Sequence, residues 1–90
     1  MELNGASAIV TGGASGIGAA TARQLADLGA RVVVADLQAD KGQELAHEIG
    51  GVFVTVDVTK TEQIEDAVNT AMDLGPLRAL VNSAGVGWAQ

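Results

Sequence analysis

A glycine-rich run near the amino terminus has the residue types and spacing of a phosphate-binding turn. It reads Thr11-Gly12-Gly13-Ala14-Ser15-Gly16-Ile17-Gly18. Gly12 permits a tight strand exit, Gly16 lets the backbone approach a pyrophosphate, and Gly18 lets a helix pack close to a strand. N–H groups and the positive dipole end at a helix start attract phosphates. The alternative is an ordinary glycine-rich turn; a strand before the run and a helix after it favour phosphate binding.

An aspartate lies where the ribose of a dinucleotide would be recognised. Asp36 follows an apolar run and lies 18 residues after Gly18. Its carboxylate can accept hydrogen bonds from adenosine ribose hydroxyls and would repel a 2′-phosphate. The neighbouring Leu37 and Gln38 are not basic, so no cation is placed to pair with the extra phosphate of NADP. We therefore expect NAD as the cofactor; the alternative is that Asp36 serves only as a turn residue.

Two further segments follow the third and fourth apolar runs. Asp57 either begins a turn into the next helix, or accepts a hydrogen bond from an adenine amino group while Val58 packs on the ring. Asn82-Ser83-Ala84-Gly85 gives a small-residue exit that permits close approach to a cofactor. The Asn82 amide can also tie neighbouring strand ends together.

The elements that must position these residues alternate along the chain. Short β-branched runs predict strands at residues 7–11, 31–36, 52–57 and 79–82. Three helices are expected between them. Their apolar faces are predicted to be Ile17, Thr21, Leu25 and Leu28 in the first, Leu45, Ala46 and Ile49 in the second (about residues 40–49), and Ile64, Ala67, Val68, Ala71 and Met72 in the third. Thr59 and Glu62 have the spacing of a capping box for the third helix.

Strand–helix–strand repetition predicts right-handed crossovers and a parallel sheet. We therefore expect an α/β fold, a Rossmann-type sheet of about four strands and three helices built from βαβ units in the order 3-2-1-4, in one domain over residues 1–90. The pattern predicts no helix after the fourth strand, where a doubly wound sheet continues. The chain is therefore expected to be the N-terminal half of a larger, truncated fold.

The composition excludes several classes of protein. The formal charge is −6, and the few cations are scattered singly, so a nucleic-acid interface is not expected. There is no cysteine, and His47 is a lone histidine expected to be solvated, so no metal site is predicted. No apolar stretch reaches the roughly 20 residues needed to span a bilayer, and no signal peptide is recognised. We expect a soluble cytoplasmic protein with no membrane partner.

The four segments together resemble the cofactor-binding half of the classical short-chain dehydrogenase/reductase family. The family motif Thr-Gly-x-x-x-Gly-x-Gly is matched at every fixed position from Thr11 to Gly18. The family's adenine-contacting Asp corresponds to Asp57. Its Asn-Asn-Ala-Gly motif corresponds to Asn82-Ser83-Ala84-Gly85, with Ser83 in place of the second Asn. The run is most similar to members acting on 3-hydroxyacyl-CoA or hydroxysteroids.

The resemblance implies NAD(H) as partner, and hydride transfer between a nicotinamide ring and a secondary alcohol or ketone in the complete enzyme. The family's catalytic Ser, Tyr and Lys lie in the second half of its fold, and this chain has no Tyr. We assign no catalytic residue and expect the chain alone to be inactive. The residues expected to bind the cofactor are Gly12, Ser15, Gly16, Ile17, Gly18, Asp36, Leu37, Asp57, Val58, Asn82, Ala84 and Gly85.

A second hypothesis belongs to a different class: a self-assembling half-fold that acts as a structural or interaction unit without turnover. The fourth strand would be an apolar edge, and such an edge tends to pair with another chain. We therefore expect a homo-oligomer joined at or near residues 80–82. A flavin site would also use a glycine-rich turn, but the spacing from Thr11 to Gly18 argues against a flavin.

Overall fold

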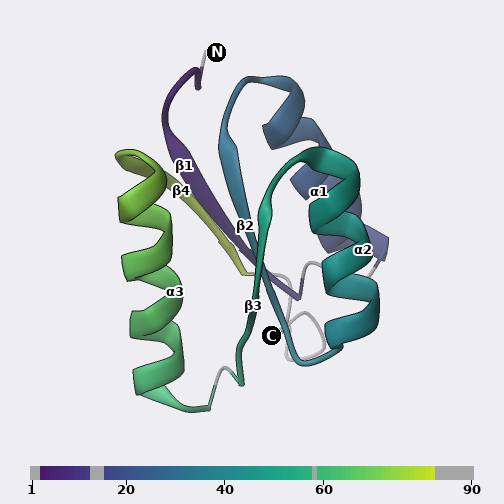
Figure 1. Ribbon diagram of the computed structural model, residues 1–90, viewed down its shortest axis with the longest axis vertical. Helices are drawn as coiled ribbons and strands as arrows, with labels where there is room; N and C mark the ends of the chain where they lie inside the picture. Colours follow the sequence, from purple (N-terminus) through teal and green to yellow (C-terminus); the bar gives the residue numbers. More distant parts are fainter. Residues whose placement is uncertain (1–2, 13–15, 58, 83–90) are drawn as a thin grey trace, which may run out of the picture.

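Strands and helices alternate along the whole described chain (Figure 1). The computed structural model describes residues 3–12, 16–57 and 59–82. The strands are β1 (Ser7–Thr11), β2 (Arg31–Asp36), β3 (Val52–Thr55) and β4 (Leu77–Asn82). The helices are α1 (Gly16–Asp27), α2 (Ala39–Ile49) and α3 (Thr61–Leu74). The first two strands have the predicted bounds, whereas β3 ends two residues earlier and β4 begins two residues earlier than expected.

The four strands form one parallel sheet in the order β3-β2-β1-β4, which confirms the predicted α/β fold and strand order. The register pairs Thr11 at the end of β1 with Ala35 in β2 and with Asn82 in β4. Because all the strands are parallel, their carboxyl ends meet at one edge of the sheet. That edge, here called the carboxyl edge, carries the candidate site.

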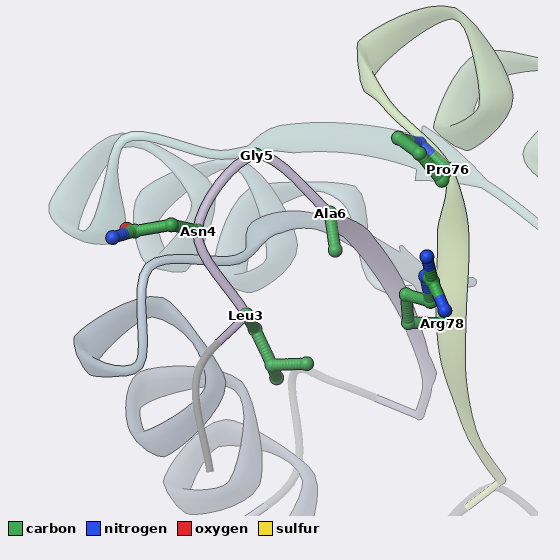
Figure 2. A pocket seen from close by; sticks show the side chains of 6 residues that line it. All are labelled: Leu3, Asn4, Gly5, Ala6, Pro76 and Arg78. Atoms are coloured by element: carbon green, nitrogen blue, oxygen red, sulfur yellow. The ribbon is translucent and has the colours of Figure 1, made fainter.

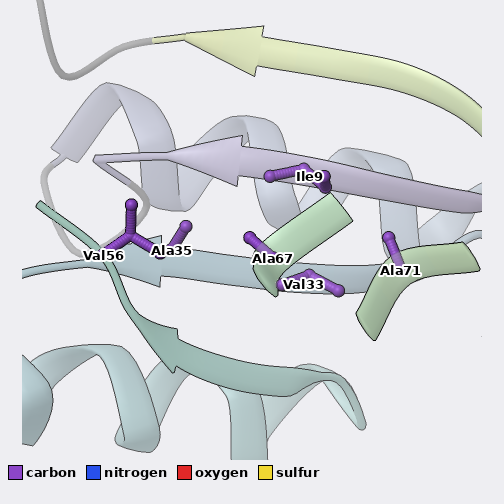
Figure 3. Packing of buried hydrophobic residues seen from close by; sticks show 6 residues of the cluster. All are labelled: Ile9, Val33, Ala35, Val56, Ala67 and Ala71. Atoms are coloured by element: carbon purple, nitrogen blue, oxygen red, sulfur yellow. The ribbon is translucent and has the colours of Figure 1, made fainter. Parts of the chain in front are cut away.

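Helices cover the sheet on both faces: α1 and α2 lie on one side and α3 on the other (Figure 1). On the α3 side, Ile9 and Val33 of the inner strands pack with Val56, Ala67 and Ala71 (Figure 3). On the opposite side, apolar residues of β1 and β2 pack with α1 and α2. The buried residues of this cluster, from the strands and the helices together, are Val10, Ala22, Val32, Val34, Leu45 and Ala46. Burial of β1 and β2 on both faces explains their unbroken apolar sequences.

The helix faces differ from the predicted stripes because the closest contacts are made by small residues. In α1 the buried residues are Gly18 and Ala22, while Ile17 is 67% exposed and Leu28 is also exposed. In α3 the buried residues are Ala67 and Ala71, while Met72 is 60% exposed. Small side chains let a helix axis approach the sheet, which turns longer neighbours outward. The prediction that Ile17, Leu28, Ile64 and Met72 face the core was therefore wrong.

The predicted capping box at the start of α3 is also corrected. The residue at the N-cap is Lys60, and no side chain caps this helix end. The hydroxyl of Thr59 instead donates to Oδ1 of Asp57, because a short polar side chain can satisfy a nearby carboxylate as readily as a helix terminus. The glycine stop of α2 is as expected: Gly50 has φ 69 and its N–H donates to the last carbonyls of the helix.

Candidate functional site

A backbone hydrogen bond joins the glycine turn to Ala35, the residue before Asp36, at the carboxyl edge. Gly12 has φ 68, a conformation that glycine adopts without the steric penalty of a Cβ. Its N–H donates to the carbonyl of Ala35 at 2.8 Å, so the exit from β1 is fixed against the end of β2. The residue after Ala35 is Asp36, whose carboxylate therefore lies at the same edge as the turn.

The start of α1 leaves room beside its backbone. Gly16 is exposed, and a Cβ built on it would meet no atom within 4 Å. Gly18, two residues later, is buried where α1 packs on the sheet. The exposed side chain of Ile17 lies between them and takes no part in the core. Ser15, which was also predicted to contact the cofactor, lies outside the described residues.

Asp36 forms a turn, as one of its two interpretations required. Its Oδ1 accepts the N–H of Gln38 at 2.8 Å. The side chain is half-buried, and the following Leu37 is exposed. Beside this turn the first residues of α2 form an open hollow of about 370 Å³ lined by Gln38, Ala39, Asp40 and Lys41. The turn and ribose interpretations are compatible, since one carboxylate offers about four acceptor positions.

Asp57 is held by more contacts than the sequence suggested. Its Oδ1 accepts both the hydroxyl of Thr59 at 2.6 Å and the N–H of Thr59 at 2.9 Å. Its own N–H donates to Oε1 of Gln63 at 2.7 Å. The Thr59 hydroxyl and then the Thr59 amide hold the pKa of Asp57 below its ordinary value, and the charge of Lys60 adds to this effect. The carboxylate is therefore ionised at neutral pH and can act as an acceptor.

The ends of β1 and β4 are tied together by side chains. The Thr11 hydroxyl lies 2.8 Å from Oδ1 of Asn82 and 3.3 Å from the carbonyl of Val81. A hydroxyl can donate only one hydrogen. The shorter distance, to Oδ1 of Asn82, indicates that the Thr11 hydroxyl donates there. The predicted tie through the Asn82 amide is thus present, and Thr11 is a partner that the sequence did not reveal. Ala84 and Gly85 lie outside the described residues, as does Val58.

The structure thus brings Gly12, Asp36, Asn82 and the start of α1 to one edge of the sheet. Asp57 lies close to them, since the N–H of the preceding Val56 donates to the carbonyl of Asp36 at 3.1 Å. Val56 itself is buried in the α3-side core, which anchors this segment. The roles of Thr59 and Gln63 were missed, because their sequence signal is only a polar residue two or six positions after an aspartate.

A second hollow lies at the opposite end of the sheet and does not contribute to this site. It measures about 400 Å³ and is lined by Leu3, Asn4, Gly5, Ala6, Pro76 and Arg78 (Figure 2). These residues precede β1 or lie just before and at the start of β4. Among the residues that the structure describes, no group of three or more His, Asp or Glu side chains could hold a metal ion, and no helix is long and apolar enough to cross a membrane.

Comparison with known proteins gives consistent matches. The family model described as short chain dehydrogenase matches residues 6–90. The chain is 49% identical over 90 residues to 3-hydroxyacyl-CoA dehydrogenase type-2 of Drosophila melanogaster, covering 97% of this chain and 35% of that protein. It is 43% identical over 89 residues to the mitochondrial borneol dehydrogenase of Lavandula x intermedia, covering 98% and 34%. The chain therefore spans about a third of the length of these curated relatives.

A solved structure has the same arrangement of elements. The crystal structure of 3-hydroxyacyl-CoA dehydrogenase type-2 from Mycobacterium avium superposes with a TM-score of 0.86 at 48% identity. The match covers 90% of this chain and 33% of that one. A dehydrogenase/reductase from Sinorhizobium meliloti 1021 superposes with a TM-score of 0.84 at 39% identity, covering 91% and 35%.

Proposed function

The chain belongs to the short chain dehydrogenase family, as its motifs predicted, and from this premise we propose that its carboxyl edge binds NAD(H). The observation that carries the proposal is the hydrogen bond from Gly12 to Ala35. It sets the glycine turn, where a pyrophosphate would lie, directly beside Asp36, which would accept the ribose hydroxyls. The open space at Gly16 fits a ligand that approaches the backbone closely.

The choice of NAD over NADP rests on the charge around Asp36. Its carboxylate would repel a 2′-phosphate, and neither Leu37 nor Gln38 carries a positive charge. Lys41 lines the neighbouring hollow together with Asp40, whose charge offsets it. The net charge of −6 also disfavours the more anionic ligand.

The proposed reaction belongs to the complete enzyme rather than to these 90 residues. When bound, the nicotinamide ring supplies hydride chemistry for a secondary alcohol or ketone. Relatives named for 3-hydroxyacyl-CoA and for borneol support that substrate class. The residues of this chain would bind and orient the dinucleotide, and none of them is assigned a catalytic role. We propose that the chain alone binds the cofactor without turnover.

The test is a calorimetric titration of the 90-residue chain with NAD⁺ and NADP⁺. We expect NAD⁺ to bind more tightly than NADP⁺, and Asp36→Ala to weaken NAD⁺ binding about tenfold, since hydrogen bonds to a charged group are lost. Asp36→Ala should also reduce the preference for NAD⁺ over NADP⁺, because the carboxylate that repels the 2′-phosphate is gone. Asp73→Ala, an exposed aspartate on α3, is the matched control and should leave both affinities unchanged.

Failure of the wild-type chain to bind NAD⁺ while its circular-dichroism spectrum is folded would overturn autonomous cofactor binding. Equal affinity for NADP⁺ would overturn the assignment of NAD alone. Any reduction of NAD⁺ by the purified chain with a secondary alcohol, above the buffer background, would contradict the proposal that it does not turn over.

A second candidate function is favoured by the edge strand. Within the described residues β4 pairs only with β1, and Leu80 of β4 is 60% exposed. An apolar strand at a sheet edge offers backbone groups and side chains to another chain. We propose homo-oligomers joined at or near residues 80–82. A cytoplasmic location stays a prediction, to be checked by fractionating cells that express the chain.

A further inference from the structure

The segment after β3 fixes the backbone of Asp57 from both sides. The preceding Val56 is 3% exposed, and its N–H is bonded to the carbonyl of Asp36. Asp57 donates its own N–H to Oε1 of Gln63 at 2.7 Å, and its carbonyl accepts the N–H of Lys60 at 2.9 Å. Gln63 lies in the first turn of α3, so the helix is attached directly to the aspartate. The main chain at Asp57 therefore has little freedom.

The carboxylate of Asp57 is also held in place, through its Oδ1 atom. The amide and the hydroxyl of Thr59 both donate to Oδ1, and the 2.6 Å contact from the hydroxyl is in the range of a charge-assisted hydrogen bond. The turn itself requires only the amide, which is the bond that Gln38 makes to Asp36. The hydroxyl of Thr59 therefore adds a constraint on the side-chain torsions beyond what forms the turn.

We propose that Thr59 and Gln63 are positioning residues that hold Asp57 so that its second oxygen, Oδ2, accepts the amino group of a bound adenine. This inference rests on the proposed NAD(H) site. An ionised carboxylate only accepts hydrogen bonds, so it favours a base with an amino group over one with a carbonyl at that position. Holding the acceptor in place before binding avoids the entropy cost of ordering it afterwards.

The experiment compares two dinucleotides and three threonine variants. The chain is titrated with NAD⁺ and with nicotinamide hypoxanthine dinucleotide, in which a carbonyl replaces the adenine amino group. Thr59→Val keeps the shape and the amide but removes the hydroxyl, Thr59→Ser restores the hydroxyl, and Thr70→Val is the matched control. Thr70 lies on the same helix as Gln63, and its hydroxyl donates to the carbonyl of Asp66. The Asp57 carboxyl is titrated by NMR in each unliganded variant.

We expect the wild-type chain to prefer NAD⁺, and Thr59→Val to reduce that preference about fivefold, the scale of one modest hydrogen bond. The pKa of Asp57 should rise in Thr59→Val and not in Thr59→Ser or Thr70→Val. Gln63→Met, which removes the acceptor for the Asp57 N–H, should also reduce the preference. A purely structural role would weaken the two dinucleotides equally.

The outcomes separate this inference from the proposed function. If wild type binds NAD⁺ and Thr59→Val keeps the full preference, the positioning role is overturned and the cofactor site stands. An unchanged Asp57 pKa in Thr59→Val overturns the positioning role whether or not NAD⁺ binds. If wild type binds neither dinucleotide, the proposed function and this inference fail together.

Discussion

At the scale of single residues, both aspartates of the carboxyl edge accept the backbone amide two residues later in the chain. The turn at Asp36 is closed by the amide of Gln38, whereas Asp57 also takes a hydroxyl and is tied to a helix through Gln63. The 2.6 Å contact from the Thr59 hydroxyl to Asp57 is in the range of a charge-assisted hydrogen bond. Protonation of Asp57 should therefore weaken the contacts that hold the segment between β3 and α3.

The first prediction concerns acid. Because the folded-state pKa of Asp57 is depressed, its ionised form stabilises the fold above the unfolded value near 3.8, and this contribution is lost as pH falls through the lowered pKa. We expect the urea midpoint of the wild-type chain to fall as the pH drops from about 4 toward about 2. Asp57→Asn should be less stable at pH 7 and should lose less on acidification.

Glu48 adds to the same acid sensitivity, since the hydrogen bond from Arg23 lowers its pKa. Asp73→Asn serves as the control, because that aspartate is exposed on α3. In this variant the urea midpoint should change with pH as steeply as in the wild-type chain. A slope in Asp57→Asn as steep as in the wild-type chain would show that Asp57 is not held as its contacts indicate.

The sequence located the aspartates correctly but not their partners. Asp36, Asp57 and Asn82 follow apolar runs, and in a parallel sheet such positions meet at one edge. The sequence pattern does not predict which partner a polar side chain will contact at that edge. Thr59 has the spacing of a helix cap, yet its hydroxyl turns back to Asp57, because short polar side chains have several backbone and side-chain partners within reach.

At the scale of elements, the junction of α2 with β3 depends on two glycines in different ways. Gly50 takes a left-handed conformation with φ 69, and a Cβ there would meet nothing within 4 Å. At Gly51 a Cβ would collide with the backbone carbonyl oxygen of Val32. The first glycine is needed for its backbone angle and the second for the close approach of β3 to β2.

We therefore predict different costs for two matched substitutions. Gly50→Ala should reduce the free energy of unfolding by about 1 kcal/mol, the cost of a left-handed alanine. Gly51→Ala should reduce it by about 2 kcal/mol, since backbone rather than a side chain must move. Gly50→Asn should recover part of the loss, as Asn tolerates that conformation. Urea denaturation measures all three, and a Gly51→Ala chain as stable as Gly50→Ala would refute the close approach.

The predictability of the elements follows from which residues make the contacts. Strands β1 and β2 were predicted to the residue, because β-branched runs bounded by polar residues are unambiguous. Helix faces were not, since large apolar residues such as Ile17 and Leu28 dominate a hydrophobic pattern even where they are exposed. The contacts are made by Gly18 and Ala22, which are too small to stand out in a hydrophobic pattern.

At the scale of the whole molecule, the strand order explains both the site and the exposed edge. The order β3-β2-β1-β4 places β1 in the interior, so the glycine turn has a neighbouring strand end on each side. The same order leaves β4 with β1 on one side in the part of the chain that the structure describes. Its side chains alternate between half-buried and exposed, and Leu80 is among the exposed ones.

The last prediction is that this edge mediates assembly. We expect light scattering to give a mass above the 9.0 kDa of one chain, rising with concentration, because an apolar edge strand gains backbone and side-chain contacts by pairing. Leu80→Lys should shift the population to monomer, since a charge on an edge strand opposes strand pairing. Leu37→Lys, at a leucine that is 64% exposed beyond the end of β2, is the matched control and should assemble as wild type does. A wild-type chain that stays at 9.0 kDa at every concentration, or a Leu80→Lys chain that assembles fully, would exclude β4 as the interface and leave cofactor binding as the proposed role of the fold.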